Sequence, residues 1–342
     1  MGWRAGLAGG AMVIFFSTRA NCGPAIQCLR SIWPAPFGAR IRMVFYEEME
    51  RLKLRPGLYV FTDVELMDEA CRARAAALRR RLLAEPGLYQ VWNDPERSTR
   101  RFDLLERLWI EGRNTFRAFR LAPGPTPPVP SGMRYPVFVR DEHLHRGPLT
   151  GLLKDEAEVK AALAELRAPG GQGVDTDLLV VEFLDYASAD GVYRKYSYMR
   201  MGADFYPKHV LYNNHWSVKH PKAGQFDFGP WLAEEWVFLR ERPHEEEIRR
   251  LFDECGIDFG RVDYTVVNGK VQVFEMNSNP TVFQTSFFKP ISRRPVHEWF
   301  REHYARIIVK NDKERTAPLL RRLCWRLRRP KVVPVPWWRA WQ

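Results

Sequence analysis

Apolar and polar positions follow one another in blocks whose lengths suit short strands and longer helices. The apolar run at 58–61 predicts a strand, and Thr62 or Asp63 directly after it is a candidate cap for a following helix. Over 68–85, Ala and Leu occupy one helical face and Arg the other. This pattern indicates an amphipathic helix that packs on a sheet.

The same pattern repeats immediately downstream. Residues 87–92 predict a second strand, and 98–114 predict a second helix that begins at a Ser or Thr cap and ends near Gly112. Strand, helix, strand and helix in this order predict an α/β unit built on a parallel sheet. The stretch 122–136 is rich in Pro and Gly, and we interpret it as a stiff connector and as a domain boundary.

Beyond the connector, 137–140 predicts a strand, followed by a polar loop and a helix with Asp155 as its cap. A further apolar strand is expected from Asp177. The rough alternation over 191–212 predicts an antiparallel hairpin. Residues 256–280 predict another hairpin, because the pair Asn268 and Gly269 between two apolar runs is a strong turn signal.

The first residues differ from this pattern. A positive charge and a short apolar stretch open the chain, which superficially resembles a signal peptide, but no convincing small-residue cleavage site follows and the stretch is too short to span a bilayer. We therefore expect a weakly structured extension over 1–42. Our hypothesis is that an upstream start codon has been taken for the true one, which the intact mass of the native protein would test.

Composition limits the class of protein. With 342 residues, 45% of them hydrophobic, the chain is long enough for two or three domains. Its net charge of +12 favours an anionic partner, although much of the excess lies in the basic, Trp- and Pro-rich tail 311–342. The five Cys have no metal-type spacing with a His pair, so a zinc site is not expected and a reduced cytoplasmic setting fits best.

Candidate chemistry lies in the last hairpin. Its turn places Asp263 opposite 274–276, and the period of two puts Glu275 and Asn277 on one face. Converging carboxylate and amide oxygens suit Mg²⁺ that also holds phosphate oxygens. The alternative is that the acids face solvent and that Asn277 and Asn279 only form a turn before Pro280. The apolar strands around them argue against that alternative, because acids within such strands are costly unless a cation matches them.

This hairpin, RVDYTVVNGKVQVFEMNSNPTV, resembles the metal-binding segment of ATP-grasp enzymes, which include D-alanine ligases, glutathione synthetases and ribosomal-protein glutamate ligases. The resemblance implies that Asp263, Glu275 and Asn277 bind two Mg²⁺ ions, with Mn²⁺ as an alternative, that bridge the phosphates of ATP. It also implies that Arg261 contacts the transferred phosphate or an acyl phosphate.

Other segments resemble the family in the same chain order, over about residues 56–290. Arg140 stands where a Lys usually reaches the α-phosphate, which changes the geometry but keeps the charge. The loop after it lacks the usual glycines, so His145 or Arg146 is a candidate for closing the phosphate site. Glu182 would accept from the adenine amino group, and the backbone of Phe183 and Leu184 would pair with the ring edge.

The remaining candidates follow the hinge. Asp190, or with less support Asp185, would hold the ribose hydroxyls. Arg194 would face substrate or phosphate as a catalytic residue, with Lys195 pointing the other way by alternation, and Lys208 is a further phosphate-side candidate. Taken singly, each of these side chains is as well explained by a solvated surface charge. Their joint order supports the functional interpretation.

The resemblance implies an α/β (α+β) fold of the ATP-grasp type. The units would be an α/β domain over 43–122, the linker 123–136, and two mixed-sheet subdomains over 137–183 and 184–310 that clasp the nucleotide.

The implied activity is a ligase reaction that forms a carbon–nitrogen bond. A small-molecule or peptide carboxylate would be activated by ATP as an acyl phosphate and attacked by an amine. Two alternatives remain from the sequence: a kinase of the same fold acting on a hydroxyl, and a non-catalytic nucleotide-binding module. The basic tail would then contact an anionic membrane surface weakly, and no nucleic acid partner is expected.

Overall fold

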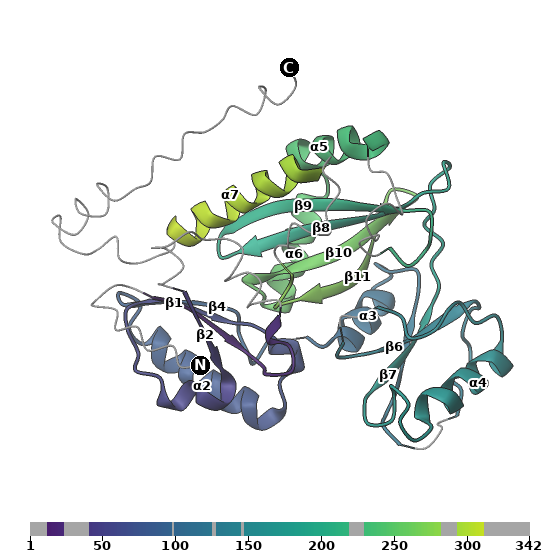
Figure 1. The fold of residues 1–342 in the computed structure, drawn as a ribbon, viewed down its shortest axis with the longest axis horizontal. Helices are drawn as coiled ribbons and strands as arrows, with labels where there is room; N and C mark the ends of the chain where they lie inside the picture. The colour runs from purple at the N-terminus through teal and green to yellow at the C-terminus, as the bar shows by residue number, and fades with distance from the viewer. Residues whose placement is uncertain are drawn as a thin grey trace.

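The computed structural model describes residues 12–23, 41–97, 99–124, 128–144, 147–218, 229–281 and 293–310. Its strands form three sheets, with orders β2-β1-β3-β4, β5-β7-β6 and β11-β10-β8-β9. Figure 1 shows the first sheet beside α2, the second beside α4, and the third beneath α5 and α7. The mixture of helices with one parallel and two antiparallel sheets confirms the predicted α/β (α+β) class.

The N-terminal sheet is parallel, as the strand and helix order predicted. Its strands are β1 (Met12–Ser17), β2 (Ile41–Phe45), β3 (Gly57–Phe61) and β4 (Tyr89–Trp92). β1 is an inner strand that pairs with β2 on one side and β3 on the other. The expectation of a weakly structured segment over 1–42 is therefore wrong for β1 and for the first residues of β2.

β1 belongs in the sheet because both of its faces are covered. Ile14 and Phe16 pack in one core cluster, Val13 and Phe15 pack in another, and all four are buried. A strand buried on both faces is continuously apolar instead of alternating. This continuity is why the run could be taken for the apolar part of a signal peptide.

The helix after β3 begins later than Thr62 or Asp63. A 3₁₀ turn, η3 (Val64–Leu66), follows β3, and α2 (Glu69–Leu83) begins after Asp68, whose carboxylate accepts from the N–H of Cys71. Asp63 has a left-handed φ of 56° and makes no cap. Another 3₁₀ turn, η2 (Tyr46–Arg51), follows β2.

The second sheet contains the Pro-rich stretch. It is formed by β5 (Ala118–Leu121), β7 (Leu178–Glu182) and β6 (Val137–Asp141), with α4 (Glu156–Arg167) capped by Asp155 as predicted. The stretch 123–136 joins β5 to β6 within this one sheet, so it is not a domain boundary.

The helix α3 (Arg101–Ile110) contacts β5 and β11. It therefore does not complete the N-terminal domain expected over 43–122, and its N-cap position is Arg100, without a side-chain cap. The N-terminal sheet ends with β4, and the chain then passes through α3 into the second sheet.

The third sheet is the largest. Its strands are β8 (Tyr193–Met201), β9 (Asp204–Asn213), β10 (Phe259–Val267) and β11 (Lys270–Asn277), and its helices are α5 (Leu232–Glu241), α6 (Glu245–Cys255) and α7 (Arg294–Lys310), with the 3₁₀ turn η4 (Gly229–Trp231) before α5. Both predicted hairpins are present. Asn268 and Gly269 have φ values of 51° and 73°, the left-handed conformations that a tight hairpin turn needs. The pairings in the second and third sheets are antiparallel, not mixed.

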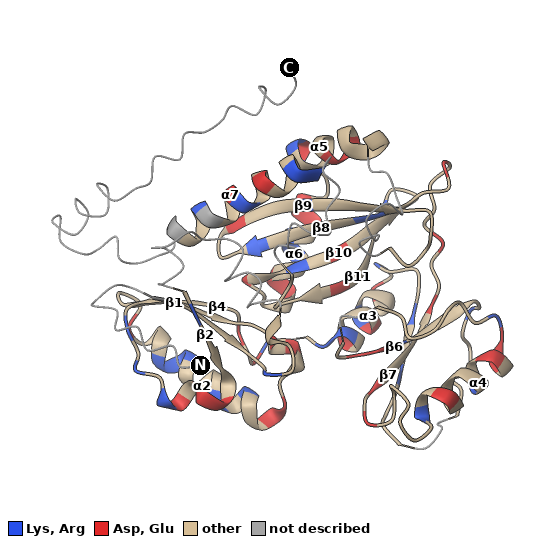
Figure 2. Cartoon of the chain, in the orientation of Figure 1, with Lys and Arg blue, Asp and Glu red and all other residues tan. Residues whose placement is uncertain are grey.

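One core joins the first and third sheets. Side chains from β1 and β3 share clusters with side chains from β8, β10 and α7. Acidic and basic residues both lie along the outer helices (Figure 2). In the described part of the chain, no helix is long and apolar enough to cross a membrane. The basic tail 311–342 lies outside the described residues.

Candidate active site

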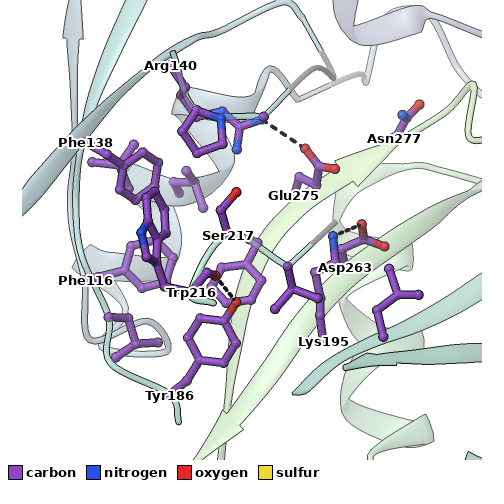
Figure 3. Close-up of a pocket in the computed structure, with 18 of the residues that line it drawn as sticks. Phe116, Phe138, Arg140, Tyr186, Lys195, Trp216, Ser217, Asp263, Glu275 and Asn277 are labelled. Carbon is purple, nitrogen blue, oxygen red and sulfur yellow. Dashed lines mark hydrogen bonds and ion pairs between the residues drawn. The ribbon is translucent and has the colours of Figure 1, made fainter. Parts of the chain in front are cut away.

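A cavity of about 460 Å³ lies where the second sheet faces the third. β6 and the end of β7 line one side, and β8 to β11 line the other, with Trp216 and Ser217 between them (Figure 3). One half of the lining is aromatic and the other half is charged. The two halves are suited to different parts of one ligand.

The acid hairpin forms the charged half. Asp263 pairs with Glu275 across β10 and β11, and Arg261 pairs with Asn277, so the register is the one predicted from the turn. All four side chains line the cavity. Asp263 is 2% exposed and the side chain of Glu275 is 14% exposed, so neither acid is a solvent-facing strand charge.

Two cations and a hydroxyl surround Asp263. Its carboxylate lies 2.8 Å from Nε of Arg261 and 3.4 Å from Nζ of Lys195, and it accepts a hydrogen bond of 2.7 Å from Ser197. Burial alone would raise the pKa of Asp263, but Arg261 and Lys195 hold that pKa below its usual value. Asp263 therefore remains a carboxylate inside the fold.

Two further cations surround Glu275. Nη2 of Arg101 lies 2.6 Å from Oε2 of Glu275, and Nη2 of Arg140 lies 3.3 Å from the same oxygen. Burial, together with the nearby charge of Arg101, lowers the pKa of Arg140 to about 10. At neutral pH Arg140 is still charged, so among the described residues four cations contact the two carboxylates of the hairpin.

Asn277 supplies an amide oxygen beside the carboxylates. Its Oδ1 accepts a 2.7 Å hydrogen bond from the N–H of Asn279. An amide oxygen has two lone pairs, so one remains for another partner. Two carboxylates and one amide oxygen on neighbouring strands are the ligands that Mg²⁺ takes when phosphates and water complete its shell. The donor set therefore fits a divalent cation held together with an anionic ligand.

A second group of potential ligands lies outside this cavity. In the described residues, Glu142, His143 and Asp177 also lie within ligand distance of one another. The Glu142 carboxylate, however, makes a two-pronged ion pair with Arg120, with distances of 2.7 and 2.5 Å. Because these three side chains lie outside the lining of the cavity, we assign them no part in the site.

Aromatic rings form the other half of the cavity. Phe138 and Trp216 have ring centroids 5.0 Å apart, and Phe183 meets Trp216 edge-on at 5.9 Å. Tyr186 fixes this wall by donating a 2.7 Å hydrogen bond to the carbonyl oxygen of Trp216. A flat heteroaromatic ring fits such a slot, because aromatic faces provide area and stacking without selecting a charge.

Glu182 lies at the cavity but is already bound within the protein. Its carboxylate accepts from the N–H groups of Arg117 and Arg134 at 3.0 and 2.9 Å, and from the guanidinium of Arg134 at 2.6 Å. The expectation that this side chain accepts from the adenine amino group stays a prediction. Phe183 donates its N–H to Pro136, whereas the N–H of Leu184 has no protein partner among the described residues.

The predicted roles of Arg194 and Lys195 are reversed. Arg194 does not line the cavity, because its guanidinium pairs with Asp190 at 2.8 Å and Glu234 at 2.9 Å. Lys195 lines the cavity instead and approaches Asp263 (Figure 3). Asp190 is likewise outside the cavity, and its hydrogen bonds to Arg194 hold its pKa below the usual value.

The remaining candidates lie around this centre. Lys208 is buried beside the cavity, and its Nζ donates to the carbonyl oxygen of Thr281 at 2.5 Å. Asp185 is not in the lining and accepts from the N–H of Ala187. His145 and Arg146 lie outside the described residues. Arg140, Phe183 and Leu184 line the cavity as expected.

The sequence did not place three residues at the site: Lys195 and Trp216, which line the cavity, and Arg101, which holds Glu275 from outside it. Arg101 is the first residue of α3, and the only available signal was an Arg at the start of a helix that precedes a strand. A lone Trp in a sequence is more often a core residue than a ligand contact, and the polar segment between a hairpin and a helix in which Trp216 lies was the available signal.

Comparison with known proteins identifies the fold. No family model and no curated sequence matches the chain. Solved structures that match include the D-alanine–D-alanine ligase from Bacillus anthracis, with 11% identity and a TM-score of 0.50, covering 89% of this chain and 97% of that one.

The same enzyme complexed with ATP matches with 9% identity and a TM-score of 0.51, covering 89% of this chain and 97% of that one. The D-alanine–D-alanine ligase from Coxiella burnetii matches with 12% identity and a TM-score of 0.50, covering 93% of this chain and 99% of that one. At these identities the likeness concerns the fold. The chain therefore has the ATP-grasp fold, in the arrangement found in the D-alanine–D-alanine ligases.

Proposed function

We propose that the cavity binds ATP, with the adenine in the aromatic half and the phosphates in the charged half. The lining of the cavity supports this orientation, because the aromatic half near Phe138 matches a flat base and the charged half near Asn277 matches a polyanion (Figure 3). With the Glu182 carboxylate held by Arg134, base recognition is assigned to the backbone of Leu184 and to stacking on Trp216.

Asp263, Glu275 and Asn277 are the residues that would hold Mg²⁺. When bound, the ion supplies charge neutralisation of the phosphates and fixes their orientation. Two ions are expected from the resemblance, with Mn²⁺ as an alternative. The role of the cations follows from their positions: Arg140 and Lys195 reach into the charged half, where they can donate to phosphate oxygens.

We further propose that the protein is a ligase that couples a carboxylate to an amine in the cytoplasm. The carboxylate oxygen would attack the terminal phosphate in line, which releases ADP and leaves an acyl phosphate, and an amine would then displace the phosphate. Arg261 lies next to Asp263 and is placed to stabilise the charge that develops on the transferred group. Small-molecule or peptide substrates are expected from the resemblance.

The observation that carries this proposal is the pair of cross-strand acids in a cavity of a ligase fold, each acid held by cations that a triphosphate can take over. A purely structural hairpin has no need of four cations around one buried and one partly buried carboxylate, because burying such charges costs several kcal/mol per ion.

Thermal unfolding with Mg²⁺ and a non-hydrolysable ATP analogue tests the nucleotide site. At about a hundredfold excess over Kd, the ligand should stabilise the wild type by about 2.7 kcal/mol. Asp263→Asn and Glu275→Gln should lose this gain, and Asp253→Asn on the outside of α6 should keep it. No stabilisation of the wild type would reject the nucleotide site.

Product analysis tests the reaction class. Beyond about one equivalent of enzyme, ADP should accumulate only when both a carboxylate and an amine are supplied, in equal amount with an amide product. ADP formed with a phosphorylated hydroxyl compound, and without an amine, would instead identify a kinase.

A further inference from the structure

Two acids that follow β3 are linked by hydrogen bonds to the turn after β11, one of them directly and the other through residues of β1 and the loop after it. Asp63 and Glu65 are 0% and 7% exposed, and both belong to the N-terminal sheet region. The turn they reach, Ser278 and Asn279, is also buried, at 1% and 2% exposure. These two residues directly follow Asn277, which supplies the amide oxygen of the candidate metal site.

Glu65 holds Ser278 at two points. Its Oε1 accepts the backbone N–H of Ser278 at 3.0 Å, and its Oε2 accepts the Ser278 hydroxyl. The hydroxyl oxygen in turn accepts the N–H of Val64 at 3.0 Å. A hydroxyl has one proton and two lone pairs, so these bonds fix its direction. The first residue after Asn277 is therefore fixed in both backbone and side chain.

Asp63 fixes the next residue through a relay. Its Oδ1 accepts from the side-chain amide of Asn21 at 2.6 Å, and its Oδ2 accepts from the hydroxyl of Ser17 at 2.8 Å. The side-chain amide of Asn279 then donates to the carbonyl oxygen of Asn21 at 3.0 Å and to Ser17 at 3.3 Å. Ser17 and Asn21, at the end of β1 and in the loop after it, thus connect Asp63 to Asn279 by hydrogen bonds.

Asn279 acts directly on the metal ligand. Its N–H occupies one lone pair of Oδ1 of Asn277 and so sets the direction of the other. Partners of this kind orient metal ligands, and losing them costs about 10- to 100-fold in metal affinity.

We propose that Asp63 and Glu65 are positioning residues for Asn277, so that docking of the N-terminal sheet completes the metal site. The proposal rests on the proposed function, because it assigns these acids to the same Mg²⁺ site. Burying these two carboxylates at a contact between the sheets has a desolvation cost that a purely apolar contact would avoid. A need for fixed geometry next to Asn277 explains why Asp63 and Glu65 stand at this contact instead of apolar residues.

The chain offers a matched control at another contact between the same two regions. Asn93, after β4, accepts from the N–H groups of Asp258 and Phe259 and donates to the carbonyl oxygens of Phe61 and Phe259. It is fully buried and joins the parallel sheet to the start of β10, and its hydrogen bonds go to Phe61, Asp258 and Phe259, not to Asn277 or the turn that follows it. Its φ of 67° suits replacement by Gly.

The test is the Mg²⁺ concentration that gives half-maximal binding of a non-hydrolysable ATP analogue, measured by calorimetry on the full chain. Ser278→Ala, Glu65→Gln and Asp63→Asn should raise it about tenfold, the lower end for lost orienting partners. Nucleotide affinity at saturating Mg²⁺ should stay at the wild-type value. Asn93→Gly should lower the unfolding midpoint and leave the Mg²⁺ requirement unchanged.

The outcomes separate the two proposals. A Mg²⁺ requirement that is unchanged in the three variants, or raised equally in Asn93→Gly, would overturn the positioning role while the nucleotide site stands. A wild type that binds the analogue without Mg²⁺ dependence would overturn the metal site and the positioning role together. Should Glu65→Gln fail to fold, Ser278→Ala decides, because it keeps the backbone bond to Glu65 and removes only the hydroxyl.

Discussion

Arg101 lies 2.6 Å from Glu275 and joins three parts of the molecule. Its Nη1 donates to the carbonyl oxygens of Asp141 and Glu142 at 3.2 and 2.6 Å, and its Nη2 donates to Glu275. The start of α3, the end of β6 with the residue after it, and the strand β11 therefore meet at one guanidinium. Its side chain is 4% exposed, so these bonds are shielded from water.

Removing this guanidinium should destabilise the fold strongly. Arg101→Met should lower the free energy of unfolding by about 3 kcal/mol, because breaking a buried ion pair leaves a buried charge, although Arg140 still contacts Glu275. Arg107→Met on the same helix should cost less than about 1 kcal/mol, since its ion pairs are a third exposed. Urea denaturation measures both. Equal losses would show that Arg101 contributes no more than a surface residue.

The sequence predicted the acid hairpin well because its signal is local. Asn268 and Gly269 fix the turn, the turn fixes the register, and the register brings Asp263 opposite Glu275. Arg101 could not be predicted in this way, because its partner Glu275 is 174 residues away in the chain. Nothing near Arg101 in the sequence indicates which strand it will meet.

The face of β8 was predicted incorrectly for a similar reason. Alternation states only that Arg194 and Lys195 point to opposite faces. Which of the two faces of β8 lines the cavity depends on the neighbouring strand β10, whose Asp263 pairs with Ser197 of β8. Lys195 shares the face of Ser197 by the period of two, and Tyr196 lies on the other face, where it stacks with Tyr264. The non-local pairing of β8 with β10 decides the question.

Metal binding should depend on the nucleotide. Arg101, Arg140, Arg261 and Lys195 outnumber the two carboxylates they contact, so a divalent cation entering alone meets net positive charge. At about 4 Å, one unit charge contributes about 4 kcal/mol at the effective dielectric constant near a protein surface. Free Mn²⁺, followed by paramagnetic resonance, should therefore bind weakly until an ATP analogue is added.

Removal of one cation should relax this requirement. Arg140→Gln should bind Mn²⁺ at least about tenfold more tightly than the wild type without nucleotide, a change of about 1.4 kcal/mol. Arg200→Gln, whose guanidinium pairs with Asp253 outside the cavity, should match the wild type. Tight Mn²⁺ binding to the free wild type would contradict the charge argument.

His244 should make stability depend on pH. It lies before α6 with a left-handed φ of 62°, and its Nδ1 is 3.3 Å from the hydroxyl of Tyr264. Burial lowers the pKa of His244 from its ordinary value of 6.5, and Glu247 offsets this only in part. Below pH 6.5 the unfolded chain then binds more protons than the folded one, so stability falls as the pH falls.

The comparison is between urea midpoints at pH 7.5 and 5.5. The wild type should lose more stability on acidification than His244→Asn, which tolerates the left-handed backbone and does not titrate. An equal loss in both proteins would show that other groups account for the acid sensitivity.

The neighbouring cations on β8 give the sharpest test of which face meets the ligand. Lys195 lines the cavity 3.4 Å from Asp263, and Arg194 pairs with Asp190 and Glu234 outside it. Lys195→Gln should weaken Mg²⁺-dependent binding of an ATP analogue by about tenfold or more, because a charged hydrogen bond contributes about 1.5–3 kcal/mol. Arg194→Gln should leave that affinity within about twofold and lower unfolding stability by at most about 1 kcal/mol, as expected for partly exposed pairs. Calorimetry and urea denaturation on the two variants separate these effects.

A larger loss of affinity in Arg194→Gln than in Lys195→Gln would mean that the opposite face of β8 meets the phosphates. It would exclude the arrangement of cations from which the metal and phosphate roles are argued.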